Sequence, residues 1–253
     1  MTSAKQNDTP NLPVAKEKPV FRRVPLSFVR RGGRITTSQE AAWEKFSNQY
    51  LVDVKREILD TSIAKEERRS PEDLFGNSAE LIVEIGTGMG EAVVHAANIT
   101  PNKNFLAVEV YKAGIAKTMM EAANLNLENI RVIDANAPEV LSTLLPAESV
   151  SEVRIFFPDP WHKAKHNKRR LISPHFAALV HTSLAPSGRV RMATDWQSYA
   201  EQMRDVFDAP PGFSRDFDGN WAERFEGRPI TSFESKGIRK GRDIRDLCYT
   251  KTA

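Results

Sequence analysis

The chain has 253 residues, 40% of them hydrophobic and 27% charged, which predicts one well-packed domain with at most short appendages. It has no apolar run of the roughly eighteen residues that span a bilayer, and its N-terminus lacks the apolar core of a signal peptide, so neither a membrane protein nor an exported one is expected. A single cysteine, Cys248, excludes a disulfide framework and favours a reducing cytoplasm, while the net charge of +3 means that any nucleic-acid site depends on where the charges lie.

Residues 1–33 are expected to form a disordered basic tail. They include several prolines and polar residues but show no hydrophobic periodicity, so they cannot bury enough apolar surface to offset the entropy of ordering. The tail ends in a basic cluster around one aromatic residue, which includes Phe28, Arg30 and Arg31. The remaining residues, 34–253, are expected to form a single folded domain.

The first predicted helix follows Thr36. Thr37 and Glu40 have the spacing of a capping box. Apolar residues then recur at helical intervals, namely Trp43, Phe46, Tyr50, Leu51 and Val54. The charged residues 65–69, which lead to Pro71, indicate a linker loop.

Strands and helices alternate from about residue 80. The compact apolar segments that predict strands are residues 81–85, 104–110, 130–134, 153–157 and 190–194. Such alternation favours a mostly parallel sheet with helices on both faces. The helical pattern stops after Asp208, and two late strands, residues 213–217 and 247–251, could complete a seven-stranded sheet.

A glycine-rich turn joins the first of these strands to the following helix. Gly86, Gly88 and Gly90 would let the backbone turn sharply and approach a ligand closely. Taken alone, the pattern also suits dinucleotide enzymes and ordinary tight turns.

Two acidic residues favour one ligand over the others. Glu109 ends the second strand about twenty residues after the glycines, where a carboxylate can accept hydrogen bonds from ribose hydroxyls. Glu84 lies inside an apolar strand and would be costly to bury without a cationic partner. A pyrophosphate is anionic and would be repelled by Glu84, whereas S-adenosyl-L-methionine (SAM) carries an ammonium and a sulfonium. After the third strand, Asn136 is placed to contact the adenine or, alternatively, to cap a helix before Pro138.

The fourth strand leads into the most informative stretch of the chain. Asp159 lies between Pro158 and Pro160, which hold the backbone extended and rigid. The basic run 161–170 follows and contains no acidic residue. Such a run is often only a solvated face, but beside a cofactor site it suits a polyanionic substrate.

These motifs resemble those of bacterial tRNA (guanine-N7-)-methyltransferases. The resemblance is carried by residues 158–163 with 166–170, by Glu84 with the three glycines, by Thr194-Asp195-Trp196 and by residues 228–234, and it covers the chain from about Ser27 onward. It implies a Rossmann-like class I SAM-dependent methyltransferase whose partner is tRNA and whose target is the variable-loop guanine at position 46. One departure is Asn136, where many members have aspartate. No obligate protein partner is implied, and the oligomeric state stays open.

The resemblance also assigns roles to individual residues. SAM is expected at Glu84, Gly86, Gly88, Gly90, Glu109, Asn136 and Asp159, and Asp159 is the expected catalytic residue. The expected substrate-binding residues are Lys163, Asp195, Thr231, Ser232, Phe233 and Glu234. The basic stretches are expected to contact RNA through Arg30, Arg31, Lys165, His166, Asn167, Lys168, Arg169 and Arg170.

The expected chemistry needs little catalytic apparatus. N7 of guanine carries a lone pair and no proton, so no general base, catalytic triad or metal is expected, although His162 and His166 lie four residues apart. Catalysis should come from positioning N7 in line with the methyl group, with Asp159 or Asp195 favouring the cationic product. One of these aspartates or Glu234 could accept the guanine N1–H and amino protons. Asp195 could equally be the N-cap of a helix that begins at Trp196.

Three other functions remain open on the sequence alone. The chain could be a SAM-dependent methyltransferase of another RNA base or of a small molecule, or a nicotinamide dehydrogenase, or an RNA-binding protein without catalysis. The basic run disfavours a small molecule, Glu84 disfavours the dehydrogenase, and the intact glycines disfavour a non-catalytic role.

Overall fold

The computed structural model describes residues 35–57, 59–209 and 211–252. The expected N-terminal tail, with Arg30 and Arg31, lies outside the described residues, so its role in binding RNA stays a prediction.

The first helix, α1 (Thr37–Tyr50), has its N-cap one residue earlier than predicted. Thr36, in extended backbone, is the N-cap, and the capping box joins it to Gln39, whose Oε1 accepts the Thr36 amide at 2.9 Å. The box predicted at Thr37 and Glu40 was therefore wrong by one position. The helical interpretation also extended too far, because Leu51 leaves the helix and forms a parallel bridge with Val132. Pro71 of the expected linker occupies the first turn of a short helix, α2 (Pro71–Phe75).

The centre of the molecule is a seven-stranded sheet in the order β3-β2-β1-β4-β5-β7-β6. Its strands are β1 (Leu81–Ile85), β2 (Asn104–Glu109), β3 (Ile130–Asp134), β4 (Val150–Phe156), β5 (Leu184–Thr194), β6 (Phe213–Arg215) and β7 (Arg245–Lys251). The first five strands run parallel, β7 is antiparallel to β5, and β6 is antiparallel to β7. The predicted α/β fold with a mostly parallel sheet is confirmed.

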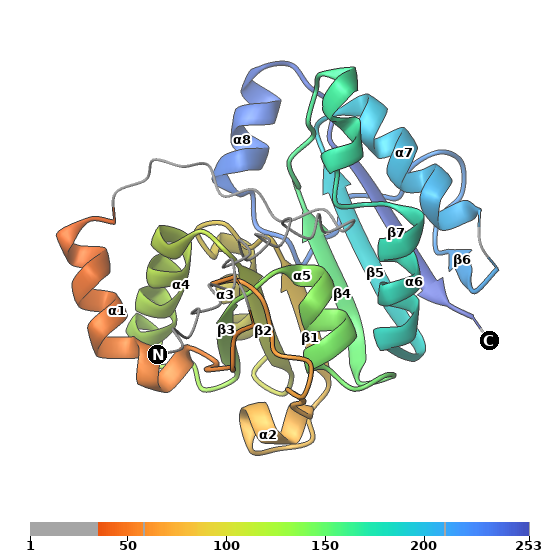
Figure 1. Ribbon diagram of the computed structural model, residues 1–253. Helices are drawn as coiled ribbons and strands as arrows, with labels where there is room; N and C mark the ends of the chain where they lie inside the picture. Colours follow the sequence, from red (N-terminus) through yellow and green to blue (C-terminus); the bar gives the residue numbers. More distant parts are fainter. Residues whose placement is uncertain (1–34, 58, 210, 253) are drawn as a thin grey trace, which may run out of the picture.

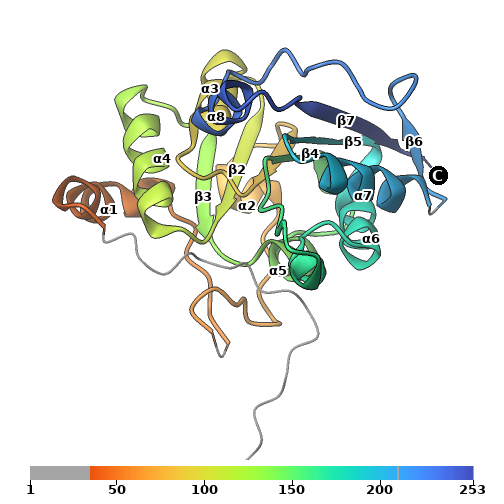
Figure 2. The ribbon, with the colours of Figure 1, turned by 90° about the horizontal axis from the view of Figure 1, so that it is seen from above.

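Helices cover both faces of this sheet, as Figures 1 and 2 show. One face packs against α1, α3 (Glu91–Ile99) and α4 (Lys112–Asn124), around buried residues such as Phe105 and Val132. The opposite face packs against α5 (Ala137–Glu139), the π-helical turn η1 (Val140–Leu144), α6 (Pro174–Ser183) and α7 (Gln197–Asp208). Two packed layers of side chains therefore fix the strands, and the carboxyl ends of the parallel strands meet at one edge, where open sheets of this kind bind ligands.

The sequence did not predict the helix α8 (Ser232–Arg239). Among its residues only Glu234 and Gly237 are buried, so its sequence carries no apolar stripe to indicate a helix. Thr231 caps α8 by accepting the Glu234 amide at 3.2 Å. Figure 2 shows α8 beside α3, and a hydrogen bond from Ser232 to Glu91 joins the two helices.

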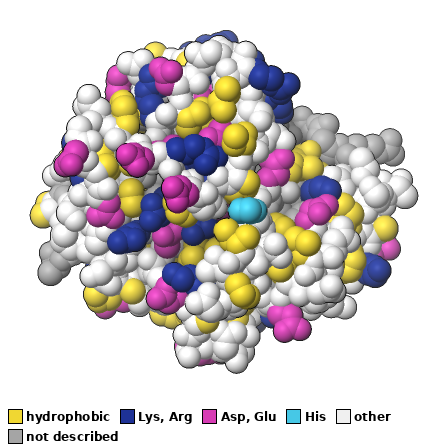
Figure 3. Space-filling model, turned by 180° about the vertical axis from the view of Figure 1, so that it is seen from behind, with side chains coloured by type: hydrophobic (Ala, Val, Ile, Leu, Met, Phe, Trp, Pro, Cys, Tyr) yellow, Lys and Arg dark blue, Asp and Glu magenta, His cyan; other side chains and the backbone are white. Residues whose placement is uncertain are grey.

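Charge is distributed without one dominant patch on the face shown in Figure 3. Lys and Arg side chains alternate there with Asp, Glu and hydrophobic side chains. Over the described ranges, no helix combines the length and the apolar character that crossing a membrane requires.

Candidate active site

The glycine-rich turn lies where β1 ends. Gly86, Gly88 and Gly90 have φ values of 73°, 56° and 80°, in the left-handed region that favours glycine. A Cβ at Gly90 would in addition overlap the Thr118 side chain of α4. Sequence reasoning missed Gly114 in α4, where a Cβ would overlap the Gly88 carbonyl. A glycine inside a helical segment just after β2 was the available signal, and its absent side chain lets α4 pack against the turn.

Glu109, at the end of β2, holds this turn in place. Its Oε2 accepts the Gly88 amide at 2.7 Å, and its Oε1 accepts the amides of Val110 at 2.7 Å and Tyr111 at 3.0 Å. Burial raises the pKa of Glu109, against the effect of these hydrogen bonds. A carboxylate can accept about four hydrogen bonds, so Glu109 can hold the turn and still accept one from a ribose hydroxyl.

Glu84 is buried in β1 opposite Arg154 of β4. Its Oε2 makes no hydrogen bond with the part of the chain that the structure describes. Burial raises the pKa of Glu84 to about 7, although the nearby Arg154 guanidinium acts in the opposite direction. An incompletely satisfied acid at this depth is costly and suits a site that a cationic donor completes.

Two more buried oxygens at the same edge lack hydrogen-bond partners within the described residues: Thr87 Oγ1 and Asp134 Oδ1. With Glu84 they provide acceptors at the ends of β1 and β3, which fits a ligand that carries an ammonium and hydroxyl donors. Asn136 is also buried and holds the N-cap position of α5, but its side chain does not cap that helix. Asn136 therefore occupies the predicted N-cap position without a capping hydrogen bond from its side chain, and the adenine contact stays a prediction.

Asp159 lies on a turn with strained backbone on both sides. Phe157 and Trp161 have positive φ values of 53° and 45°, which are uncommon for aromatic residues. The turn follows β4, and the Phe157 amide at its start donates to the Ala193 carbonyl of β5 at 2.7 Å. Asp159 itself is exposed at this edge of the sheet. Strain held by surrounding contacts is typical of functional turns, so the turn is well suited to present a fixed carboxylate.

Arg170 has a different role from the RNA contact that was expected. Its guanidinium is buried and donates to the Pro160 carbonyl at 2.8 Å and to Gln202 Oε1 at 2.7 Å. It also lies 4.7 Å from the centre of the Tyr199 ring. The expectation was wrong because every residue of the basic run was assumed to be exposed. Arg170 is instead buried and anchors the Asp159 turn to α7.

The rest of the basic run is accessible. Residues 164–169 form a short 3₁₀ helix, η2 (Ala164–Arg169), on which Lys165 and Lys168 are exposed, as is Lys163 before it. Arg169 lies 5.1 Å from the centre of the Trp161 ring. Partial loss of solvent around His166, together with the cations next to it, lowers the pKa of His166 and disfavours its protonated form. The lysines and Arg169 therefore carry the positive charge of this segment.

The carboxylate of Asp195 accepts a hydrogen bond from Arg242 at 2.7 Å. The same guanidinium lies 5.1 Å from the centre of the Trp196 ring. Trp196, not Asp195, is the N-cap of α7, so the capping alternative for Asp195 was wrong. Asp195 is half-buried at the end of β5, and Gly237 of α8 lies against it.

The segment 231–234 divides into two pairs of residues. Thr231 and Glu234 are buried and stabilise α8 from within, since Glu234 accepts hydrogen bonds from Arg224 at 2.7 Å and from the buried Arg228 at 3.2 Å. Burial alone would raise the pKa of Glu234, but these two arginines outweigh it and lower the pKa. Arg228 also binds Asp246 at 2.6 Å, which completes a buried network that the sequence did not indicate.

Ser232 and Phe233 point toward the cofactor turn. The Ser232 amide and hydroxyl donate to Glu91, the first residue of α3, at 2.7 and 2.5 Å. Phe233 is 56% exposed, and its ring lies 3.8 Å from the position that a Cβ on Gly88 would take. The structure thus brings α8 to the glycine-rich turn, and Glu91 is a residue of this region that sequence reasoning missed.

The fold and the site together define a Rossmann-like methyltransferase of the class I, SAM-dependent type. A family model described as "Putative methyltransferase" matches residues 78–247. The chain is 46% identical to the tRNA (guanine-N(7)-)-methyltransferase of Arthrobacter sp. (strain FB24), an alignment that covers 90% of this chain and 86% of that protein. It is 42% identical to the tRNA (guanine-N(7)-)-methyltransferase of Acidovorax sp. (strain JS42), over 89% of this chain and 85% of that one. The chain belongs to the tRNA (guanine-N(7)-)-methyltransferase family, as its motifs predicted.

Solved structures show the same fold at low sequence identity. The 16S rRNA methyltransferase KamB aligns with a TM-score of 0.51 at 16% identity, over 88% of this chain and 97% of that one. TrmN from Thermus thermophilus aligns with a TM-score of 0.50 at 19% identity, over 69% of this chain and 44% of that one. These likenesses support the fold alone.

Proposed function

We propose that this enzyme transfers the methyl group of SAM to N7 of a guanine in tRNA, at position 46 of the variable loop. The observation that carries the proposal is the Asp159 turn, which Arg170 fixes at the edge of the sheet and which leads directly into exposed cations. Family membership supports the substrate class, since the relatives are tRNA (guanine-N(7)-)-methyltransferases. A tRNA substrate is consistent with a cytoplasmic enzyme.

SAM fits the acceptors at the ends of β1, β2 and β3. Glu84 would attract its ammonium, Glu109 would accept from a ribose hydroxyl, and Asn136 would contact the adenine. When bound, SAM supplies an electrophilic methyl group. The glycine-rich turn can approach it closely because its backbone already has the required left-handed conformation.

The protein's own residues then have three tasks. They hold N7 in line with the methyl group, exclude water, and stabilise the positive charge that develops on the guanine. N7 carries a lone pair and no proton, so no residue has to remove one. The exposed Asp159 carboxylate is placed for the third task, because the turn that presents it is held rigid on both sides.

Of the three acidic residues that the sequence offered for recognition of the guanine edge, two already bind arginines. Glu234 is buried between Arg224 and Arg228, and Asp195 is paired with Arg242, so each would have to share its oxygens with a cation. The exposed Phe233 beside Gly88 offers a ring on which the base can stack. Asp159 and Phe233 are therefore the residues that we assign to the base.

The proposed function is tested by incubating the purified enzyme with SAM and unmodified tRNA. Digestion to nucleosides and mass spectrometry against standards should show 7-methylguanosine, and ribonuclease mapping should place it in the variable loop. A tRNA in which that guanine is replaced by adenine is the control and should remain unmethylated. Methylation of another base, or the absence of transfer from a protein that binds SAM, would overturn the proposal.

A further inference from the structure

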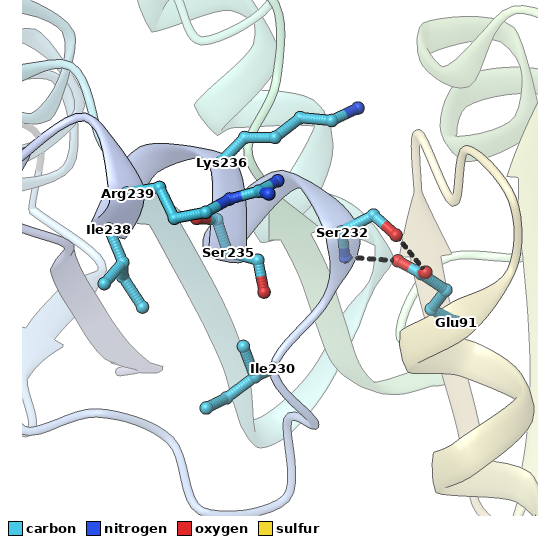
Figure 4. A pocket seen from close by; sticks show the side chains of 7 residues that line it. All are labelled: Glu91, Ile230, Ser232, Ser235, Lys236, Ile238 and Arg239. Carbon is cyan, nitrogen blue, oxygen red and sulfur yellow. Dashed lines mark hydrogen bonds between the residues drawn. The ribbon is translucent and has the colours of Figure 1, made fainter.

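A second pocket lies on the outer side of α8, next to the active site (Figure 4). Its volume is about 640 Å³, and it is lined by Glu91, Ile230, Ser232, Ser235, Lys236, Ile238 and Arg239. The roles inferred above for α8 do not use Ser235, Lys236, Ile238 or Arg239. We propose that this pocket binds a nucleotide of the tRNA that neighbours the methylated guanine. The inference rests on the proposed function, since it assumes that tRNA is the substrate.

The position of the pocket fits a neighbouring nucleotide. Phe233, which we assign to the target base, reaches the glycine-rich turn at Gly88. The Lys236 ammonium lies 5.3 Å from the centre of the Phe233 ring and also lines the pocket. The pocket is therefore adjacent to the ring that we assign to the target base, so RNA that places a guanine on Phe233 can reach the pocket with a neighbouring nucleotide.

The walls of the pocket match the two parts of a nucleotide. Ile230 is 65% exposed and Ile238 is 50% exposed, an unusual position for two large apolar side chains on one small surface. An unstacked base can pack its face on such side chains. Ser235 directs its hydroxyl toward Ile230, where it can bond to the base edge (Figure 4).

Two cations complete the pocket. Lys236 and Arg239 are exposed on α8, and no acidic side chain of the described ranges forms an ion pair with either of them. They can therefore bind a phosphate without first breaking a salt bridge.

Glu91, the one acidic residue that lines the pocket, is compatible with the binding of a phosphate there. Both oxygens of Glu91 accept hydrogen bonds from Ser232, and they lie at the N-terminal ends of α3 and α8, where helix dipoles favour negative charge. The same hydrogen bonds tie α8 to the residue that follows Gly90. The pocket is consequently held in a fixed position relative to the cofactor turn, so little ordering is needed when the RNA binds.

The test compares two double variants with a matched control. Lys236→Ala/Arg239→Ala removes the cations, and Ile230→Ala/Ile238→Ala removes the apolar walls. As the control, Lys103→Ala/Arg189→Ala removes two positive charges, one half-buried and one exposed, outside the pocket and the active site. Binding of unmodified tRNA is measured between low and moderate salt, and SAM affinity is measured to show that each variant is folded.

The two variants should differ in their salt dependence. Removal of the cations should reduce the slope of log affinity against log salt by about 0.7–0.9 for each phosphate that the variant no longer binds. Removal of the isoleucines should weaken binding with an unchanged slope, by up to about 150-fold, the upper end of the range for an aromatic side chain that stacks on one base. The control should match the wild type.

An abasic nucleotide locates the binding position. Wild-type enzyme should bind tRNA more weakly when the nucleotide on one side of the target guanine lacks its base, and the isoleucine variant should then show no further loss on that RNA. The pocket assignment would be overturned if both variants bound tRNA as tightly as the wild-type enzyme does. It would also be overturned if the isoleucine variant still lost affinity for each of the two RNAs in which one neighbour of the target guanine lacks its base. That failure is distinct from failure of the proposed function, in which the wild-type enzyme itself would not methylate tRNA.

Discussion

Replacing Glu84 with glutamine isolates one charge in the proposed cofactor site. Glu84 is buried, its Oε2 lacks a hydrogen-bond partner among the described residues, and burial raises its pKa to about 7. Only the ionised form attracts the ammonium of SAM, so affinity should be lost as the pH falls through 7. For a pKa of about 7, the ionised fraction falls from about one half at pH 7 to about 3% at pH 5.5, which predicts a loss of about 15-fold in affinity.

The assay is titration calorimetry with SAM between pH 5.5 and 7. An α-amino group has a pKa of about 7.7–8.0, so the charge of the ligand hardly changes over this range. The Glu84→Gln protein should bind weakly and nearly independently of pH, and a Glu121→Gln protein, altered at an exposed residue of α4, should follow the wild type. Parallel pH curves for the wild-type and Glu84→Gln proteins would refute the assignment of Glu84 to the ammonium.

Glu84 should also affect the stability of the ligand-free protein, which is expected to fall as the pH rises, whereas the affinity for SAM is expected to increase. Because the pKa of Glu84 is higher in the folded state, the folded protein binds more protons between pH 4.5 and about 7, and its stability falls as the pH rises through that window. Glu84→Gln removes this loss, so the variant should gain about 3 kcal/mol over the wild type at pH 8 and little at pH 4. Urea unfolding without ligand measures both values, and a difference that does not change with pH would contradict the raised pKa.

Four further variants test the remaining assignments. Asp159→Asn should bind SAM and tRNA almost normally but lose about 100-fold in single-turnover rate, and a near-wild-type rate would remove its charge from the mechanism. Lys168→Ala/Arg169→Ala should weaken tRNA binding and lower its salt slope by about 0.7–0.9 per phosphate, with unchanged SAM affinity; an unchanged slope would make these residues a solvated surface. Glu109→Ala should cost about 1.5–3 kcal/mol of SAM binding in a protein that still folds, and calorimetry showing full affinity would exclude the ribose contact. Arg170→Ala should cost about 1–3 kcal/mol of stability, because the acceptors at Pro160 and Gln202 lose their donor, whereas an exposed RNA-binding residue would cost almost nothing in unfolding experiments without RNA.

The sequence alone determined the parts of this protein that local pattern controls. The central parallel strand β1 is buried on both faces, and residues 81–85 therefore form a short apolar run that stands out between helices. The left-handed backbone at Gly86, Gly88 and Gly90 requires glycine, so the turn left a visible motif. Acids at strand ends, such as Glu109, could be assigned to the cofactor edge because parallel strands bring their carboxyl ends together.

Only the tertiary structure decided which charged side chains are available to a ligand. Arg170 and Lys168 look equivalent in the sequence, yet Arg170 is buried against α7 and Lys168 is exposed. Glu234 is likewise enclosed by Arg224 and by Arg228, which Asp246 binds from β7. Burial and ion pairing depend on neighbours that the chain supplies from distant positions, and no periodicity records them. The link between Glu91 and Ser232, 141 residues apart in the chain, shows the reason most clearly, because α8 has almost no buried apolar surface of its own and is positioned by contacts with distant parts of the chain.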